Sequence, residues 1–404
     1  MKEGWTYKKL GECIDNLRTG LNPRTHFKLN TPDATGYYIT VRELCGFSFK
    51  VNSKTDRVND KALKRINERS NLQIGDVLYS GTGTIGKTAL VTELPTWWNI
   101  KEGVYAITPK HDILDSLFLI YLTQSEFFIN SINSKTSGTT VKSIPMKEFV
   151  GINIPVPPLS EQQSIVVQLD EAFAEIDLIK SEAEKQLSEA KALFQKALSQ
   201  AMTPKEGWEK KTLGDITISM ADGPFGSNLK KEHYTTKKEV RIIQLSNIGE
   251  EGWREDNTKY TTFEHLKTIQ RSEVKPNDIV IAKMMPAGRA ILCPNKESAY
   301  VLSSDAVRAT LKDDLNNRFI LFSINSEHFR KQVYANVSGS GRVRTSLTKL
   351  KVCSLWLPPL SEQQRIVEEL DELSENVKEI EALNNKLTAE CDAMKQALLR
   401  QVFE

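Results

Sequence analysis

The chain of 404 residues contains two related halves, and this duplication limits the fold more than any other feature of the sequence. The heptapeptide Pro-Pro-Leu-Ser-Glu-Gln-Gln occupies residues 157–163 and returns at residues 358–364, an offset of 201. The tetrapeptide Lys-Glu-Gly-Trp occupies residues 2–5 and returns at residues 205–208. Seven identical residues in one run are far beyond chance, so each half consists of a globular segment followed by a second element.

Each second element has the sequence of a long helix. Two prolines stop whatever precedes it, and Ser160 or Ser361 is placed to cap the helix, with Gln163 or Gln364 completing a capping box. No proline or glycine follows for about forty residues, a length that rises about 60 Å as a helix. Such a helix is longer than a domain of 150 residues is wide, so we expect the two helices to pack on each other.

Apolar residues in both helices recur with the 4-3 spacing of a coiled-coil seam. Because the first helix leads through one globular segment into the second, the chain path favours antiparallel packing with a globular segment at each end. Gln186 and Asn384 are polar breaks in the two seams. The predicted spacer residues are Ile165, Leu169, Ile176, Ile179 and Leu193 in the first helix, and Ile366, Leu370, Leu373, Val377, Ile380, Leu387 and Leu398 in the second.

The globular segments mix short β-branched runs with turn signals and helical stretches, which is typical of α+β domains. The predicted fold is therefore a tandem duplication, with two pseudo-two-fold related α+β domains separated by a long antiparallel two-helix coiled coil. The predicted boundaries are residues 1–156 and 203–357 for the domains, and residues 157–202 and 358–404 for the helices.

A net charge of +2 hides a segregation of charge along the chain. The helical segments 159–202 and 360–404 carry −4 and −6, whereas the globular segments 1–156 and 203–359 carry +5 and +7. The two helical segments thus form an acidic frame that carries two basic domains. This distribution of charge favours the binding of an extended anion such as DNA by the domains.

Other features exclude several classes of protein. Hydrophobic residues make up 39% and charged residues 26%, as in ordinary globular proteins, and no apolar run is long enough to cross a bilayer. No signal peptide is evident, so we expect a cytoplasmic protein. The five cysteines and five histidines show neither zinc-ligand spacing nor a catalytic triad. The chain therefore resembles a binding protein more than an enzyme.

One motif points toward nucleotide chemistry. Residues 81–88, Gly-Thr-Gly-Thr-Ile-Gly-Lys-Thr, satisfy the P-loop pattern and follow a strand-like run. A working P-loop must open a helix, yet the next residues read as strand or loop, and the matching slot 282–289 of the second half keeps only a late glycine and a following base. A glycine-rich loop that places Lys87 against a phosphate backbone is the interpretation we favour.

Four loops combine glycine, hydroxyl and basic residues at matching places in the two halves: residues 18–24, 137–142, 223–231 and 338–345. Glycine lets the backbone approach phosphates, hydroxyls and amides donate to them, and arginine or asparagine can reach base edges. We predict Lys87, Lys142, Lys230 and Lys231 as phosphate contacts. The candidate DNA-binding residues are Arg18, Thr19, Asn22, Arg24, Arg42, Ser80, Thr82, Lys87, Thr139, Thr140, Lys142, Ser227, Asn228, Lys230, Lys231, Gln244, Asn247, Lys283, Arg289, Arg342 and Arg344, of which Arg342 and Arg344 are the predicted base readers.

A basic domain, then Pro-Pro-Leu-Ser-Glu-Gln-Gln opening a long helix, then the same pair again, resembles the specificity (S, HsdS) subunit of type I restriction-modification systems over the whole chain. The resemblance implies two target-recognition domains that each read one half of a bipartite sequence in double-stranded DNA. It also implies helices that set the gap and dock two modification subunits.

By the same resemblance, the modification subunits bind S-adenosylmethionine and methylate adenine N6. Restriction subunits add ATP- and Mg-dependent translocation and cleavage, and this chain itself holds no catalytic residue, metal or cofactor. Two alternatives stay open from the residues alone: a P-loop nucleotide-binding protein with coiled-coil arms, and a coiled-coil adaptor that does not bind DNA.

Overall fold

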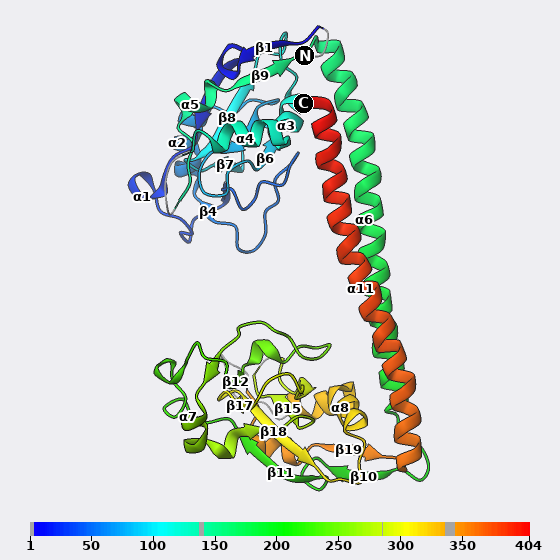
Figure 1. Cartoon of the computed structure of the whole chain (residues 1–404). Coiled ribbons are helices and arrows are strands. Elements are labelled where there is room, and N and C mark those ends of the chain that lie inside the picture. The colour runs from blue at the N-terminus through cyan, green and yellow to red at the C-terminus, as the bar shows by residue number, and fades with distance from the viewer. Residues whose placement is uncertain (1–3, 137–140, 285, 336–343) are drawn as a thin grey trace. The chain divides into compact units, whose positions relative to one another are not determined.

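The computed structural model describes residues 4–136, 141–284, 286–335 and 344–404. The chain divides into two compact units, the first formed by Met1–Ala183 with Asn385–Glu404 and the second by Glu184–Asn384. Each unit contains one globular portion and a part of each long helix, α6 (Leu159–Ala201) and α11 (Leu360–Phe403) (Figure 1).

The first globular portion contains nine strands and five helices among the described residues. Its strands are β1 (Thr6–Lys9), β2 (Ile14–Thr19), β3 (Gly36–Ile39), β4 (Arg57–Val58), β5 (Val77–Ser80), β6 (Thr88–Leu90), β7 (Trp98–Ile100), β8 (Val104–Pro109) and β9 (Asn153–Val156). Its helices are α1 (Pro23–His26), α2 (Asp60–Ser70), α3 (Ser116–Gln124), α4 (Glu126–Asn133) and α5 (Met146–Val150).

The second globular portion repeats this order with one additional strand, β14, and with a short 3-10 helix, Lys231–His233, in the place of α1. Its strands are β10 (Glu209–Thr212), β11 (Thr217–Asp222), β12 (Val240–Ile243), β13 (Tyr260–Thr261), β14 (Glu273–Val274), β15 (Ile279–Ala282), β16 (Ala290–Leu292), β17 (Tyr300–Leu302), β18 (Ala306–Leu311) and β19 (Ser354–Leu357). Its helices are α7 (Phe263–Thr268), α8 (Asn317–Asn325), α9 (Glu327–Ala335) and α10 (Leu347–Lys351).

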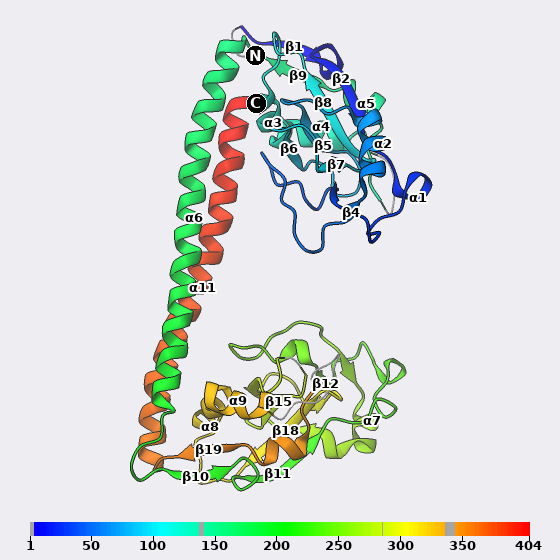
Figure 2. The ribbon, with the colours of Figure 1, turned by 180° about the vertical axis from the view of Figure 1, so that it is seen from behind.

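The sheets of the two portions correspond strand by strand. The order β2-β8-β5-β6 of the first portion returns as β11-β18-β15-β16, and β4-β3-β7 returns within β13-β12-β17-β14. The helix pair α3–α4 lies beside the sheet β2-β8-β5-β6, and α8–α9 lies beside β11-β18-β15-β16, as Figure 2 shows. Phe118 and Phe128 share a buried cluster with Val77 and Ile107 of that sheet. The duplicated sequence therefore folds twice into the same α+β architecture, as predicted.

A buried glutamine joins each long helix to its globular portion. The side-chain amide of Gln162 donates to the carbonyls of Ile113 (2.8 Å) and Pro157 (2.9 Å), and its oxygen accepts from the amide of Asp115 (2.9 Å). Gln363 makes the matching contacts with the carbonyl of Pro358 (2.9 Å) and the amide of Asn316 (3.1 Å). A buried amide that meets three backbone groups holds the start of the helix in one orientation.

The two short sequence repeats meet at the same joint. The indole of Trp5 donates to Glu161 (2.8 Å), and the indole of Trp208 donates to Glu362 (3.1 Å). Strands β1 and β10, which follow these tryptophans, pair antiparallel with β9 and β19, the strands that lead into the helices. Residues at the two ends of each half are thus repeated because they contact each other.

The predicted capping box at the helix start is wrong. Helix α6 begins at Leu159, one residue before the expected cap, and α11 begins at Leu360. Ser160 and Gln163 therefore lie exposed inside the first turn. The amides of Glu161 and Gln162 instead donate to the carbonyl of Pro158, which turns the chain into the helix directly from the proline pair.

Within the first unit, the beginning of α6 packs antiparallel on the end of α11. Ion pairs join Asp177 to Lys395 (2.6 Å) and Lys180 to Asp392 (3.2 Å), so the partner number falls as the number on α6 rises. Val166, Leu169, Phe173, Leu399 and Phe403 share the buried cluster of the first portion. Both helices therefore belong to the core of this unit.

Within the second unit, the end of α6 lies beside the beginning of α11. Lys191 on α6 is 2.8 Å from Glu381 on α11 and 2.8 Å from Glu251 of the globular portion. Hydrogen bonds to these two carboxylates raise the pKa of Lys191. Leu198, Ile366 and Leu370 share the buried cluster of the second portion, so the helices complete this core as well.

Two predicted seam residues lie outside the helix contact. Ile179 and Leu193 are 49% and 61% exposed, so their assignment to the seam is wrong. After Ile176 the less exposed face of α6 continues through Lys180, Ala183 and Leu187. These positions keep the seven-residue spacing, but one of the two seam positions in each heptad lies one residue later than predicted, so Lys180 takes the place of Ile179 and Phe194 that of Leu193. The structure leaves the other predicted spacer residues half-buried or buried: Ile165, Leu169, Ile176, Ile366, Leu370, Leu373, Val377, Ile380, Leu387 and Leu398.

Replacing Gln162 with alanine should destabilise the first unit by about 1–3 kcal/mol, because it leaves buried backbone groups without partners. The urea midpoint of unfolding should fall, and the amide of Asp115, which donates to Gln162, should exchange its hydrogen faster. Gln163→Ala is the matched control, since Gln163 is exposed on the same helical turn. Equal midpoints and equal exchange rates for the two variants would contradict the role of the buried joint.

Candidate nucleic-acid interface

The loop with the P-loop pattern is the turn of a β-hairpin. It connects β5 to β6, and the two strands pair antiparallel. The hydroxyl of Ser80 is buried, where it donates to the carbonyl of Thr84 (2.7 Å) and accepts from the amide of Lys87 (2.8 Å). Thr88 begins strand β6 and not a helix, as the sequence predicted, so the helix N-terminus on which a P-loop binds phosphate is replaced by a strand. Thr82 and Lys87 are exposed on the turn.

The second half forms the same hairpin with different residues. The amide of Ser80 donates to the carbonyl of Lys87 (2.8 Å), and the amide of Ala282 donates to the carbonyl of Arg289 (2.8 Å). Gly86 and Gly288 take matching left-handed conformations, with φ of 97° and 85°. The loss of the Gly-Thr-Gly sequence in the second half therefore leaves the ends of the turn unchanged.

The predicted loops come together in pairs. In the first unit the amide of Gly83 donates to the carbonyl of Lys142 (2.9 Å), and the amide of Ile144 donates to the carbonyl of Gly81 (3.0 Å). In the second unit the amide of Thr345 donates to the carbonyl of Lys283 (2.9 Å). Each hairpin turn is thus hydrogen-bonded to the segment that follows α4 in the first unit and α9 in the second. The candidates Thr139, Thr140 and Arg342 lie outside the described residues.

Close backbone contact explains a glycine that both halves share. A Cβ atom at Gly20 would lie 1.7 Å from the carbonyl oxygen of Ile100, and one at Gly223 would lie 1.7 Å from that of Ser303. Only glycine fits at such a crossing. The crossing turns the chain after β2, and after β11, toward the hairpin loop.

In the first unit these loops surround a hollow of about 630 Å³. Three basic residues, Arg24, Arg69 and Lys101, line it, and each is exposed and without an ion-pair partner among the described residues. The sequence analysis missed Arg69 and Lys101, because one ends a helix and the other follows a strand, where no glycine-hydroxyl pattern marks them. The remaining lining residues are Thr19, Asn22, Pro23, Thr82, Glu102, Gly103, Tyr105, Val141, Ser143, Ile144, Pro145 and Met146.

Several candidate residues have partners inside the fold of the first unit. Arg18 forms an ion pair with the buried Asp76 (2.8 Å), and burial raises the pKa of that carboxyl group. The hydroxyl of Thr19 donates to the carbonyl of Val104 (3.0 Å), and the side chain of Asn22 caps α1. Arg18 is therefore held inside the domain and is not one of the cations that line the hollow, whereas Thr19 and Asn22 line it with side chains fixed by these hydrogen bonds.

The second unit shows the same division. Lys283 is buried and forms an ion pair with Asp222 (2.7 Å), and Asn247 is buried with its amide on the carbonyl of Arg254 (3.0 Å). Burial lowers the pKa of Arg289. Gln244 and Arg289 are half-buried. All four side chains are therefore buried or half-buried in the second domain.

Other candidates of the second unit are exposed. Ser227, Asn228, Lys230 and Lys231 are exposed on the loop after β11. Two stacked imidazoles, His233 and His265, lie beside this loop with centroids 4.1 Å apart.

Two exposed arginines are fixed by carboxylates. Arg344 lies 3.0 Å from Asp305, and Arg42 lies 2.8 Å from Asp56.

The fold and these paired loops can be compared with those of known proteins. A family model described as the type I restriction modification DNA specificity domain matches residues 2–189 and 205–389. The chain belongs to this family. It carries the specificity domain twice, and each copy contains one hairpin loop with its paired segment.

Curated relatives agree with this assignment. The chain is 24% identical over 303 residues to the type I restriction enzyme StySPI specificity subunit of Salmonella potsdam, an alignment that covers 71% of this chain and 64% of that protein. It is 23% identical over 384 residues to the MjaVIII specificity subunit of Methanocaldococcus jannaschii, covering 91% and 85%. The chain thus spans less than two thirds of the first relative and most of the second.

Solved structures share the fold. A chain studied for the complex assembly and conformational transition of the type I R-M system has a TM-score of 0.72 at 18% identity, covering 100% of this chain and 98% of that one. The HsdS subunit from Thermoanaerobacter tengcongensis has a TM-score of 0.51 at 18% identity, covering 100% and 97%. In the described part of this chain, no helix is long and apolar enough to cross a membrane. No group of three or more histidine, cysteine or acidic side chains among the described residues is arranged to hold a metal ion.

Replacing Lys101 with glutamine should weaken binding to all DNA sequences alike, because a lysine in the hollow would contact phosphate and not bases. The slope of log affinity against log salt should become shallower by about 0.9. Lys378→Gln on α11 is the matched control, since Lys378 is exposed and lies on the acidic frame. The same titration applies to Lys87, Lys142, Lys230 and Lys231. An unchanged slope for Lys101→Gln would place the DNA away from the hollow.

Proposed function

We propose that this chain is the DNA sequence-recognition subunit of a type I restriction-modification complex and that each specificity domain reads one half of a bipartite target. The observation that carries the proposal is the repeated pairing of a hairpin turn with a second loop, bordered in the first unit by unpaired cations. The segregation of positive charge into the two domains supports it. Membership of the DNA specificity domain family supports it as well.

The chemistry of the complex then belongs to other subunits. Two modification subunits would bind S-adenosylmethionine and methylate adenine N6, and restriction subunits would bind ATP and Mg²⁺ and cleave the DNA. The conversion of the P-loop-like segment into a β-hairpin supports this division, since the turn runs into β6. The chain would select the sequence at which its partners act.

The long helices offer a surface for the modification subunits. Among their exposed side chains, seven are large and apolar: Val167, Leu178, Ile179 and Leu193 on α6, and Leu360, Leu383 and Met394 on α11. Adjacent exposed apolar residues are more informative than single ones, and Leu178 and Ile179 are neighbours on α6. The seam residues that the sequence analysis misplaced, Ile179 and Leu193, thus gain a function as partner contacts.

The isolated chain should show no methyltransferase, nuclease or ATPase activity, whereas its mixture with the modification subunit should methylate one split sequence. The double variant Leu178→Ser with Ile179→Ser should reduce copurification of the modification subunit by about tenfold, because it removes about 1.4 kcal/mol or more of apolar burial. Glu182→Gln on the same exposed stretch is the control. Turnover by the chain alone, or equal copurification of both variants, would contradict the proposal.

The helices would also set the gap between the two half-sites. Four additional residues lengthen a helix by one turn, about 6 Å, which corresponds to nearly two base pairs. Inserting such a turn in α6 between Lys180 and Lys191, with a matching turn in α11 between Glu379 and Glu390, should lengthen the gap and leave both half-site sequences unchanged. The insertion also rotates one domain by about 40°, so affinity should fall. Sequencing of methylated sites decides the outcome, and changed half-sites with an unchanged gap would show that the helices do not set the spacing.

A further inference from the structure

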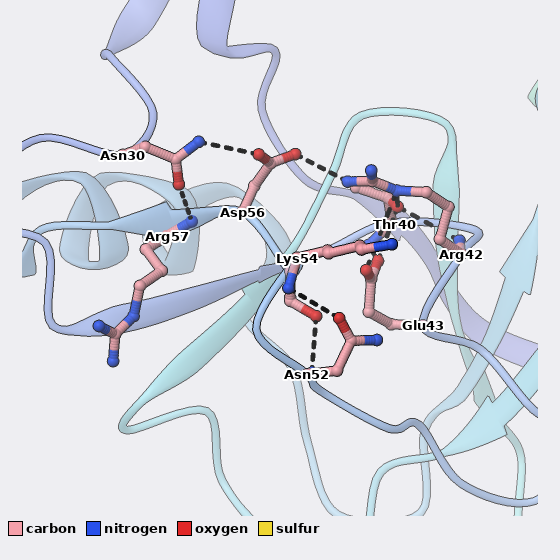
Figure 3. Close-up of polar contacts among 9 residues, drawn as sticks. Asn30, Thr40, Arg42, Glu43, Asn52, Lys54, Asp56 and Arg57 are labelled. Atoms are coloured by element: carbon pink, nitrogen blue, oxygen red, sulfur yellow. Dashed lines mark hydrogen bonds and ion pairs between the residues drawn. The ribbon is translucent and has the colours of Figure 1, made fainter. Parts of the chain in front are cut away.

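The first specificity domain contains an arginine whose orientation is fixed from two sides. Arg42 lies on the turn after β3, and its side chain is 58% exposed. Its Nη2 donates to Oδ2 of Asp56 (2.8 Å), and its Nε donates to the hydroxyl of Thr40 (3.4 Å). Figure 3 shows the guanidinium between these two partners.

Each partner of Arg42 is itself oriented by another residue. The side-chain amide of Asn30 donates to Oδ1 of Asp56 (3.0 Å), and its oxygen accepts from the amide of Arg57 (2.8 Å). The hydroxyl of Thr40 donates its hydrogen to the buried Glu43 (2.7 Å). The lone pairs of the same hydroxyl oxygen are therefore available to accept from Arg42. Two short chains of hydrogen bonds therefore converge on one exposed cation (Figure 3).

The contacts of Arg42 leave part of its guanidinium free. Nε lies 3.4 Å from the hydroxyl of Thr40 and 3.9 Å from the carboxylate of Glu43, and Nη2 lies 2.8 Å from Asp56. The two N–H donors of Nη1 have no partner among the described residues. Guanidinium N–H groups bind O6 and N7 of guanine in the major groove, and Nη1 is free to make such a contact.

The second domain keeps the turn and changes these residues. The amide of Thr40 donates to Glu43 (2.8 Å), and in the second domain the amide of Gln244 donates to Asn247 (2.9 Å). In the same register Arg42 corresponds to Ser246. The amides of Tyr38 and Ile242 donate to the carbonyls of Asp56 and Lys259, so Lys259 takes the place of the aspartate. The two domains share the backbone of this turn but not the arginine–aspartate pair, as expected of residues that read one half-site only.

We propose that Arg42 reads a guanine in the half-site of the first domain and that Asp56, oriented by Asn30, is its positioning residue. This inference rests on the proposed function. A phosphate contact needs only a positive charge, and an exposed lysine such as Lys54 on the same surface supplies one. A guanidinium held by Asp56 and Thr40 presents the two free N–H donors of Nη1 in fixed directions, so its structure suits recognition of a base more than attraction to a backbone.

The test uses the full chain in complex with its modification subunit. The methylated motif of the unaltered complex is determined first, and the absence of any motif would overturn the proposed function itself. Affinity is then measured for the cognate duplex and for duplexes that each replace one base pair of the first half-site. Arg42→Lys keeps the charge and removes the paired donors, and Asp56→Asn keeps the shape and removes the charged partner.

Arg42→Lys should lower the affinity for the cognate duplex by about tenfold or more and lose discrimination at one G·C pair, while binding to unrelated DNA stays the same. Asp56→Asn should lose part of the same discrimination, and Asn30→Ala should do so more weakly. Lys54→Gln, the matched control, should weaken binding to all duplexes equally. Full discrimination by Arg42→Lys would overturn the proposal and leave Arg42 a phosphate contact. Full discrimination by both Asp56→Asn and Asn30→Ala would overturn the positioning role.

Discussion

The fixed junction between helix and domain is the constraint on which the rest of the structure depends. The start of each long helix is held in one direction relative to the domain that precedes it. Gln162 and Gln363 do this by binding backbone groups on both sides of the junction with one buried side-chain amide each. Because a buried amide tolerates few unmet hydrogen bonds, the junction has one favoured geometry. Each helix therefore leaves its domain as a rigid continuation of it.

The duplicated fold tolerates an exchange of two side chains when the interaction between them is preserved. In the first domain Arg57 lies over the ring of the cross-strand Tyr37, with 5.0 Å to the centroid. In the second domain the two residue types are reversed across the same pair of strands, where Arg241 lies 5.5 Å from the centroid of Tyr260. Each strand pair keeps one cation–π contact. The shared fold is thus maintained by interactions and not by residue identity, which leaves the exposed loop residues free to differ between the two domains.

Much of the fold follows from local signals in the sequence. The heptapeptide repeat and the absence of proline and glycine predict both long helices, and the P-loop-like segment is correctly predicted not to open a helix. The helix start differs by one residue, because Pro158 and not Ser160 receives the first helical amides. The interface was predicted less well. Arg18 and Lys283 are predicted to contact DNA, yet each pairs with an aspartate 58 or 61 residues away in the chain.

The sequence alone therefore determined the duplication, the α+β class, the two helices and the opposite charges of frame and domains, since repeats, periodicity and charge are properties of neighbouring residues. Tertiary structure decided which basic residues face the hollow, which face of each helix is exposed, and which glutamine of the repeated pair is buried. Ile179 has the spacing of a seam residue and is exposed, while Arg69 lies outside every motif and lines the hollow. These outcomes depend on contacts between segments far apart in the chain, and no pattern of adjacent residues records the distance at which such segments meet.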